Sequence, residues 1–381
     1  MKPVIHSLRD SIDDFFKSHS DITQEECDQF AIDLIGGPVA PLSVQGFRTP
    51  FSDLDAKLLD AARQIHGKLV ATCSFRGRIG QGSLLIYSME KLPGIPYISA
   101  APLYRKGPEA ELLQLKRSTT VEDFALFFAD SWKGRQSLPA DAMDKLHADY
   151  HLRFERLAQS LPSRFQRNLK DVRSSLPRLF SPEYPLAVNH GDLSQTNILI
   201  DPDGGHITGI IDRTEARISP FGIPLWEVDS VLGYMNSGGW HYHDGYLELR
   251  ALFWQTFEGA VGSVSYETRC LIDVARMAGL FLRYGFASDG DGQQVVREDD
   301  PSFMYLDAFC ALENPAARLK SDKIQERDRL KLGIPSDDHG GPLFDSPVSV
   351  PASIAWGWGY PLQPFAMEST KKNIKPGDLC R

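Results

Sequence analysis

The spacing of apolar residues in the first third of the chain predicts helices and one small sheet. Residues 8–35 have helical character up to a Gly-Gly-Pro breaker, and residues 52–65 again repeat apolar side chains at helical spacing. Residues 67–88 contain two strand-like runs around a glycine-containing turn, which predicts a β-hairpin. This part of the chain therefore mixes helices with strands.

Helical periodicity dominates from residue 120 onward. Thr120, followed by Asp123, predicts a helix start, and apolar residues then share one face up to Trp132. A second apolar stripe runs from Met143 to Leu161. A mostly β segment followed by a larger helical one predicts an α+β fold with a small N-terminal and a large C-terminal lobe.

The composition changes again near residue 330, where Pro, Gly, Ser and Asp become frequent. We therefore expect an N-terminal lobe over residues 1–99, a helical lobe over 100–330 and an irregular tail over 331–381.

Charge and cysteine usage restrict the class of protein. The chain has 50 acidic and 41 basic residues, a net charge of −9, which disfavours nucleic-acid or anionic-membrane partners and favours cationic or neutral ones. The five cysteines are scattered, which fits a reducing cytosol. The most apolar segment, residues 271–287, contains Asp273, Arg276 and Arg283, so it predicts an amphipathic helix rather than a membrane span.

The stretch "NHGDLSQTNILIDPDGGHITGIID" (residues 189–212) predicts a second hairpin that gathers polar side chains. With its turn at Gly204-Gly205, Asn197 would lie opposite Asp212 at the open end, and the preceding loop would bring Asp192 to the same place. Two carboxylates and an amide oxygen are hard ligands that suit Mg²⁺ on nucleotide phosphates, with a free carboxylate to take a proton from a hydroxyl. The pattern therefore predicts phosphoryl-transfer chemistry.

The motif "HGDLSQTNILI" with "GIID" resembles the superfamily of aminoglycoside phosphotransferases and choline kinases, in which Gly replaces the Arg of the protein-kinase His-Arg-Asp. The segments "LLIYSMEKLPG", "SPFGIPLWEVDSVLG" and "GGWHYHDGYLELRALFW" resemble the fungal members of the aminoglycoside phosphotransferase family. The resemblance implies a protein-kinase-like bilobal fold. It also implies ATP or another nucleoside triphosphate with Mg²⁺ as cofactors, and a hydroxyl-bearing small molecule as substrate, a cationic one among the candidates.

Carried over by position, the resemblance implies Asp192 as the catalytic base and His190 as a brace for its loop. Asn197 and Asp212 would be the metal ligands. The hinge that meets the adenine would correspond to residues 87–90, of which Tyr87, Met89 and Glu90 are the candidate nucleotide contacts.

Two departures from the family pattern stand out. The sequence predicts a deletion of the phosphate-covering loop and its strands between Gly46 and Phe47, which would leave Arg48 as a candidate replacement for the missing basic residue. Arg213 replaces the usual aromatic residue after the metal-binding Asp. Its guanidinium could compete with the metal for the Asp212 carboxylate, or it could instead pair with Glu215.

Two functions follow from these features and stay open at this point. One is phosphorylation of a small-molecule hydroxyl; the other is a catalytically impaired, pseudokinase-like protein that binds a ligand or partner. Glu227 and Asp229 could attract a cationic substrate, although solvated helix acids or caps are the commoner reading of such residues.

Overall fold

The computed structural model describes most of the first 310 residues. The described ranges are 12–13, 16–17, 22–37, 54–80, 84–100, 110–236, 239–287 and 294–310. The predicted deletion between Gly46 and Phe47, together with Arg48, lies outside these ranges, and so does the tail predicted for residues 331–381.

Helices make up most of the described structure. They are α2 (Gln24–Ile35), α3 (Ala56–His66), α4 (Tyr97–Ala100), α5 (Ala110–Lys133), α6 (Ala140–Ser160), α7 (Gln166–Leu179), α8 (Glu227–Val231), α9 (Tyr246–Val261), α10 (Tyr266–Tyr284) and α11 (Phe303–Cys310). Three short 3-10 turns accompany them: η1 (Gly67–Leu69), η3 (Ser163–Phe165) and η4 (Ile223–Trp226). The helices predicted over residues 52–65 and 143–161 correspond to α3 and α6. Within the described ranges, no helix has both the length and the apolarity that crossing a membrane requires.

The strands form small antiparallel sheets. They are β1 (Cys73–Ile79), β2 (Leu84–Met89), β3 (Ile95–Pro96), β4 (Leu186–Asn189), β5 (Ile198–Ile200), β6 (Ile207–Ile210), β7 (Arg217–Pro220), β8 (Gly233–Asn236) and β9 (Gly239–Tyr242). β1 pairs with β2, β4 with β7 and β8 with β9, while β3, β5 and β6 form a three-stranded sheet. The predicted α+β fold class, mostly helical with small sheets, is confirmed.

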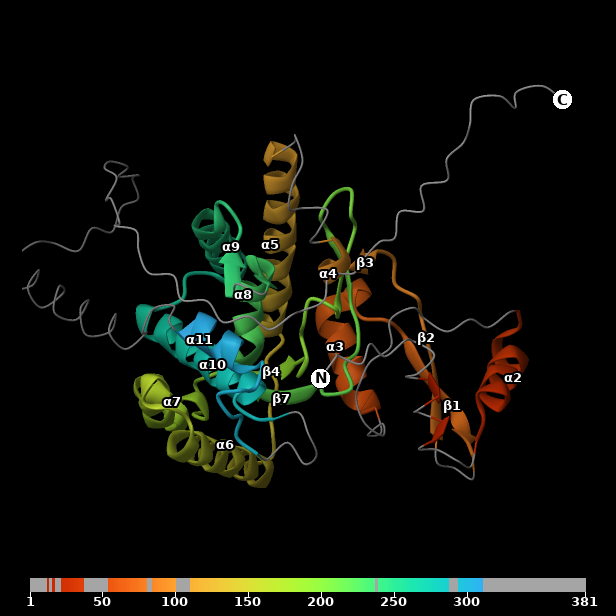
Figure 1. Ribbon diagram of the computed structural model, residues 1–381, viewed down its shortest axis with the longest axis horizontal. Coiled ribbons are helices and arrows are strands. Elements are labelled where there is room, and N and C mark those ends of the chain that lie inside the picture. The colour runs from red at the N-terminus through yellow and green to blue at the C-terminus, as the bar shows by residue number, and fades with distance from the viewer. Residues whose placement is uncertain are drawn as a thin grey trace, which may run out of the picture.

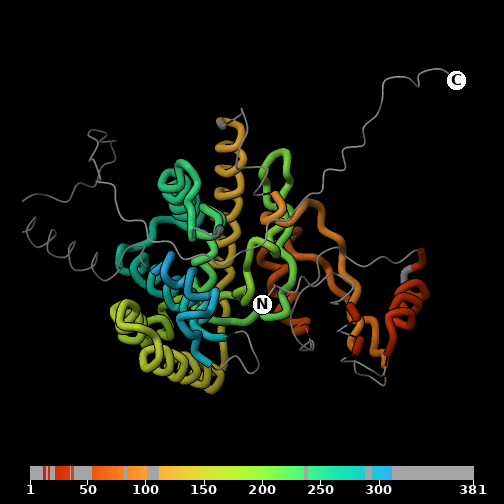
Figure 2. The backbone as a smooth tube through the Cα atoms, viewed as in Figure 1, coloured from red at the N-terminus to blue at the C-terminus, as the bar shows by residue number. Residues whose placement is uncertain are grey.

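The first predicted hairpin is present as β1 and β2. Its register shifts at Gly77, which lies at φ 137°, and Phe30 of α2 lies next to this glycine. Figures 1 and 2 draw α2 and this hairpin on the right of the molecule, with the helices α6, α7, α9, α10 and α11 on the left and the long helix α5 between them.

The predicted helix start at Thr120 is wrong, because α5 begins at Ala110 and Thr120 is buried in its middle. The Thr120 hydroxyl donates to the carbonyl oxygens of Lys116 (3.1 Å) and Gly205 (2.6 Å), and the Asp123 carboxylate accepts from the backbone of Ile207 (2.9 Å). The cap-like Thr and Asp thus bind the turn of the second hairpin instead of capping a helix.

Aromatic packing between α5, α9 and the segment after β7 forms the centre of the core. Phe128 of α5 contacts Phe253 of α9 (ring centroids 6.0 Å apart), and Phe221 stacks on Phe257 (5.8 Å). All four rings are almost fully buried, so each contributes about 1.5–3 kcal/mol of hydrophobic stabilisation. This core carries β4, β7 and α8, the elements that hold the polar residues of the candidate site.

Candidate functional site

The loop between β4 and β5 contains the predicted His-Gly-Asp motif. At its start, the Asn189 side chain donates to Ser219 Oγ (2.7 Å) and to the carbonyl oxygens of Ser219 (3.2 Å) and Pro220 (3.1 Å) on β7. Because Asn189 is 4% exposed, these three bonds satisfy a buried amide and hold the loop against the sheet.

The backbone at Gly191 has no room for a side chain. Its φ is 85°, and a Cβ there would lie 2.1 Å from the carbonyl oxygen of Glu215. Any other residue would clash with the backbone, so the close approach of the two loops requires glycine.

His190 is buried and joins two segments of the candidate site. Its Nε2 donates to the carbonyl oxygen of Ile211 at 2.7 Å, which joins the loop to the end of β6. Burial, helped by the positive charge of Arg213, lowers the pKa of His190 to about 3, so the ring is neutral near pH 7. A neutral ring with its proton on Nε2 is the form that can donate this bond.

Asn197 connects the loop to the second hairpin. Its Nδ2 donates to the carbonyl oxygen of Asp192 (2.7 Å), and its own carbonyl oxygen accepts from Ile211 (2.9 Å). The Oδ1 atom accepts only a long bond from Thr196 Oγ1 (3.5 Å) among the described residues, and an amide oxygen is a hard ligand of the type that Mg²⁺ prefers.

The hairpin brings Asn197 and Asp212 to the same end, but with a register one residue from the prediction. A four-residue turn and a shift between Leu199 and Ile200 pair Ile198 with Ile210, so Asn197 lies opposite Ile211 rather than Asp212. The turn closes by a bond from Gly205 to the carbonyl oxygen of Asp201, which is why a register centred on the two glycines was wrong.

Asp212 has an unusual backbone. Its φ of 57° is positive, and among the described non-glycine residues it alone has this conformation. Asp tolerates the left-handed region better than most residues, and such outliers concentrate at functional sites. The Thr214 hydroxyl donates to Asp212 Oδ1 (2.8 Å), and the side chain is exposed.

Asp192, the predicted base, is paired with a cation that the sequence did not suggest. Arg283 Nη2 on α10 lies 2.5 Å from Asp192 Oδ1, and both side chains are about a quarter exposed, at 24% and 25%. Arg283 stood out in the sequence only as a charge within an apolar helix, and its partner was not predictable from that pattern.

Arg213 does not compete for Asp212, nor does Glu215 absorb it, so both predicted alternatives are wrong. Arg213 is 5% exposed, none of its guanidinium nitrogens has a hydrogen-bond partner among the described residues, and its Cζ lies 5.9 Å from the centre of the Phe127 ring. Burial lowers the pKa of Arg213 to about 10, so it stays charged near pH 7. At the position where the family usually has an aromatic residue, this chain therefore has a buried cation that lies against an aromatic ring.

The oxygens of Asn197 and Asp212 suit Mg²⁺ by type, because it binds carboxylate and amide oxygens and keeps several waters. Across the described ranges, no group of three or more His, Cys, Asp or Glu side chains is arranged to hold a metal. Two protein ligands with water, rather than a full protein cage, is the usual pattern for Mg²⁺ on nucleotides.

The predicted hinge residues lie at the end of the first hairpin. Tyr87 pairs with Phe75 and Met89 with Cys73 across β1 and β2, and Met89 is 54% exposed. The Glu90 carboxylate accepts from Thr72 Oγ1 at 3.2 Å. Their described contacts stay within this hairpin and its surroundings, so the structure does not place them against the Asp192 loop.

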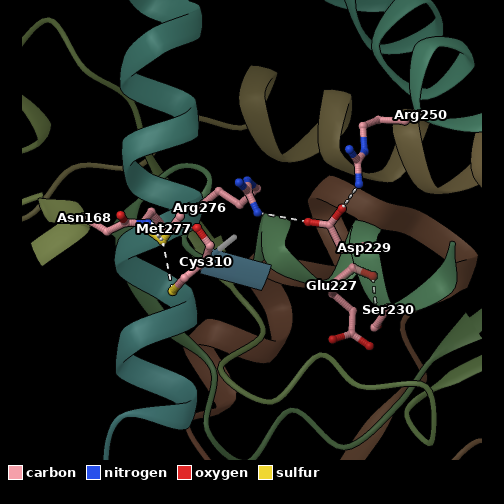
Figure 3. Close-up of polar contacts among 8 residues, drawn as sticks. All are labelled: Asn168, Glu227, Asp229, Ser230, Arg250, Arg276, Met277 and Cys310. Atoms are coloured by element: carbon pink, nitrogen blue, oxygen red, sulfur yellow. Dashed lines mark hydrogen bonds and ion pairs between the residues drawn. The ribbon is translucent and has the colours of Figure 1, made fainter. Parts of the chain in front are cut away.

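The reading of Glu227 and Asp229 as solvated helix acids or caps is wrong. Both belong to α8 and are buried, at 1% and 4% exposure. Asp229 is held by ion pairs to Arg250 and Arg276 (Figure 3).

Known proteins resemble this chain in part. Residues 58–227, less than half of the chain, match the sequence profile described as "APH: Phosphotransferase enzyme family". The solved structure of the GDP complex of aminoglycoside 2'-phosphotransferase-IIIa is 15% identical over 76% of this chain and 99% of that chain, with a TM-score of 0.43. The search of curated proteins gave no match.

Two further solved structures are similar at the same level. Aminoglycoside-3'-phosphotransferase of type VIII is 18% identical over 60% of this chain and 82% of that chain (TM-score 0.36). The aminoglycoside phosphotransferase APH(3'')-Id from Streptomyces rimosus, in complex with ADP and streptomycin, is 14% identical over 59% and 84% (TM-score 0.35). The profile match contains the His190 loop, both metal-ligand candidates and the second hairpin, so residues 58–227 are similar in sequence to the phosphotransferase enzyme family.

Proposed function

We propose that this protein transfers the γ-phosphoryl group of a nucleoside triphosphate, ATP being the first candidate, to a hydroxyl of a small molecule. The nucleotide donor is inferred from the family match over residues 58–227. The division into lobes at residues 99 and 330, the likeness to fungal members and to choline kinases, and a cytosolic location stay predictions from the sequence.

In this proposal Asp192 accepts the proton of the attacking hydroxyl. Asn197 and Asp212 hold Mg²⁺, which would neutralise the charge on the phosphates when bound. His190 positions the loop through its bond to Ile211, and the backbone of residues 87–90 would contact the base of the nucleotide.

The observation that carries the proposal is the hydrogen bond from Asn197 Nδ2 to the carbonyl oxygen of Asp192 at 2.7 Å. It joins the proposed base and a proposed metal ligand in one rigid unit. Holding reacting groups in fixed geometry is the main contribution that a protein makes to phosphoryl transfer.

Isothermal titration calorimetry of the full chain with ATP, with and without Mg²⁺, tests the nucleotide site. We expect binding that depends on Mg²⁺ in the wild type and is lost in Asp212→Ala. A matched control is Asp203→Asn, because Asp203 is an exposed carboxylate in the turn of the same hairpin.

Turnover tests the base. The rate of ADP formation from ATP in the presence of pooled hydroxyl compounds should fall at least about 100-fold in Asp192→Ala, while Mg²⁺-dependent ATP binding persists. Unchanged turnover in a folded Asp192→Ala protein would falsify the role of Asp192.

A second function is favoured by one observation. The ion pair between Asp192 and Arg283 occupies the proposed base, as expected for a pseudokinase-like protein that binds a ligand or partner without catalysis. Absence of Mg²⁺-dependent ATP binding by the folded chain would favour this function over the first.

A further inference from the structure

Charged residues on α8, α9 and α10 form a cluster beside the proposed base. The ion pairs within this cluster determine whether it attracts an anionic or a cationic ligand. Glu227 and Asp229 come from α8, Arg250 from α9, and Arg276 and Arg283 from α10. Figure 3 shows Asp229 between Arg250 and Arg276, and Glu227 lies two residues earlier on the same short helix. The charges of Asp192, Arg283 and Asp229 all act on Glu227, so the cluster is continuous with the Asp192 loop.

Both oxygens of Asp229 are already used. Arg250 Nη2 lies 2.5 Å from Oδ1, and Arg276 Nη1 lies 2.9 Å from Oδ2. The Asp229 side chain is only 6% exposed, whereas the Arg250 side chain is 26% exposed. Arg250 is therefore the more accessible partner of this ion pair, and the Asp229 carboxylate is the buried one.

Glu227 is not accessible to a cationic ligand either. It is 1% exposed, its Oε2 atom has no hydrogen-bond partner among the described residues, and burial raises the pKa of its carboxyl well above the ordinary value. At this burial the carboxyl cannot reach a ligand in solvent.

The ion-paired residues of the cluster have a surplus of positive charge. Arg250 and Arg276 share the single carboxylate of Asp229, while Arg283 pairs with Asp192. One positive charge in this set is left without a compensating carboxylate, and arginine is the side chain best suited to bind a carboxylate or phosphate in a bidentate way.

Two aromatic rings lie beside the Arg250 guanidinium. Tyr242 and Tyr246 stack with centroids 4.2 Å apart, and Arg250 Cζ lies 5.6 Å from the centre of each ring. The rings restrict the rotamers of Arg250, so its fork is held in place before a ligand arrives.

We infer that the hydroxyl-bearing substrate carries a negatively charged group, with a carboxylate as the chemical class that fits, and that Arg250 and Arg276 bind this group. The inference rests on the proposed phosphotransferase function, and it reverses the cationic substrate suggested by the acidic composition. Net charge describes the whole surface, whereas the charge beside Asp192 depends on which side chains the fold pairs there.

A matched series of probes that differ in charge tests the inference. Gluconate, sorbitol and glucamine share most of their hydroxyl groups and carry charges of −1, 0 and +1. Calorimetric titration of the full chain at constant ionic strength should give the order gluconate, sorbitol, glucamine, with gluconate binding at least about tenfold more tightly than sorbitol.

The variants locate the site. Arg250→Gln should remove the advantage of gluconate over sorbitol, and Arg250→Lys should restore part of it because the charge returns without the fork. Arg178→Gln is the control, because Arg178 also makes a 2.5 Å ion pair, with Glu267, but is 48% exposed on α7. Circular dichroism checks that each variant is folded.

Three outcomes overturn the inference: tighter binding of glucamine than of gluconate, failure of gluconate to bind, or an unchanged preference in folded Arg250→Gln. None of these readouts requires turnover or ATP. Loss of Mg²⁺-dependent ATP binding would contradict the proposed function alone, so the two failures can be told apart.

Discussion

Arg283 Nη2 lies 2.5 Å from Asp192 Oδ1, and the two side chains come from helix α10 and the β4–β5 loop, 91 positions apart in the chain. Each side chain is only about a quarter exposed, so solvent screens this pair less than a surface pair. This ion pair links the proposed catalytic loop to the helical core.

The Asp192–Arg283 pair should show a measurable coupling energy. In a double-mutant cycle of Asp192→Asn and Arg283→Gln, we expect about 1.5–3 kcal/mol of coupling in urea denaturation. The Arg178–Glu267 pair has the same 2.5 Å separation with side chains 48% and 73% exposed, so its coupling should stay below about 1 kcal/mol. Equal couplings in the two cycles would contradict the assigned effect of burial.

Arg213 is a buried charge without a hydrogen-bond partner among the described residues, so removing the charge should stabilise the protein. We expect Arg213→Met, which keeps an unbranched chain of similar length against Phe127, to raise the free energy of unfolding by about 1–3 kcal/mol. The control is Arg297→Met, because the Arg297 side chain is 86% exposed, and there a change within about 0.5 kcal/mol is expected. A destabilised Arg213→Met protein would mean that Arg213 has a binding partner in solution.

Stability should fall on acidification because of two buried histidines. Burial, followed by the nearby charge of Arg213, lowers the pKa of His66 to about 3, and the same causes act on His190. The unfolded chain binds these protons near pH 6.5, so the stabilisation is complete above about pH 6.5 and is lost as the pH falls toward about 3.

The contribution of His66 can be measured separately. Between about pH 6 and pH 4, His66→Gln should reduce the slope of the unfolding free energy against pH by about 1.4 kcal/mol per pH unit. His151→Gln is the control, because the His151 side chain is 66% exposed. A slope that His66→Gln leaves unchanged would mean that His66 is not buried in the neutral form.

Two helical glycines should respond in opposite directions to alanine. A Cβ on Gly279 of α10 would lie 1.6 Å from the carbonyl oxygen of Ile223, whereas one on Gly259 of α9 meets nothing within 4 Å. We expect Gly279→Ala to destabilise the fold by about 3 kcal/mol or more. Gly259→Ala should stabilise it by about 0.5–1 kcal/mol through helix propensity, measured by the same denaturation. Similar melting of the two variants would rule out the close contact between α10 and η4.

Local sequence patterns determined several elements correctly. The hairpin of β1 and β2, helices α3 and α6, and the gathering of Asn197 and Asp212 at one end of a hairpin all depend on contacts between residues close in the chain. Periodicity and turn residues report such contacts directly. At Thr120 the local pattern is that of a helix cap, but the Thr120 hydroxyl binds the carbonyl oxygen of Gly205, far away in the chain. The predicted helix start is therefore wrong.

Only the residues of the candidate site that lie close together in the chain were predictable from the sequence. His190, Asp192, Asn197 and Asp212 all lie within one stretch of 23 residues, so the sequence by itself determined that one loop and the hairpin after it carry all four groups. The structure alone decided the charges around them, because Arg283, Arg250 and Arg276 reach Asp192 and Asp229 from helices distant in the chain. Periodicity shows that a charge lies within an apolar helix, but ion pairing and burial depend on packing between helices, and that is why the negative composition and the positive cluster disagree.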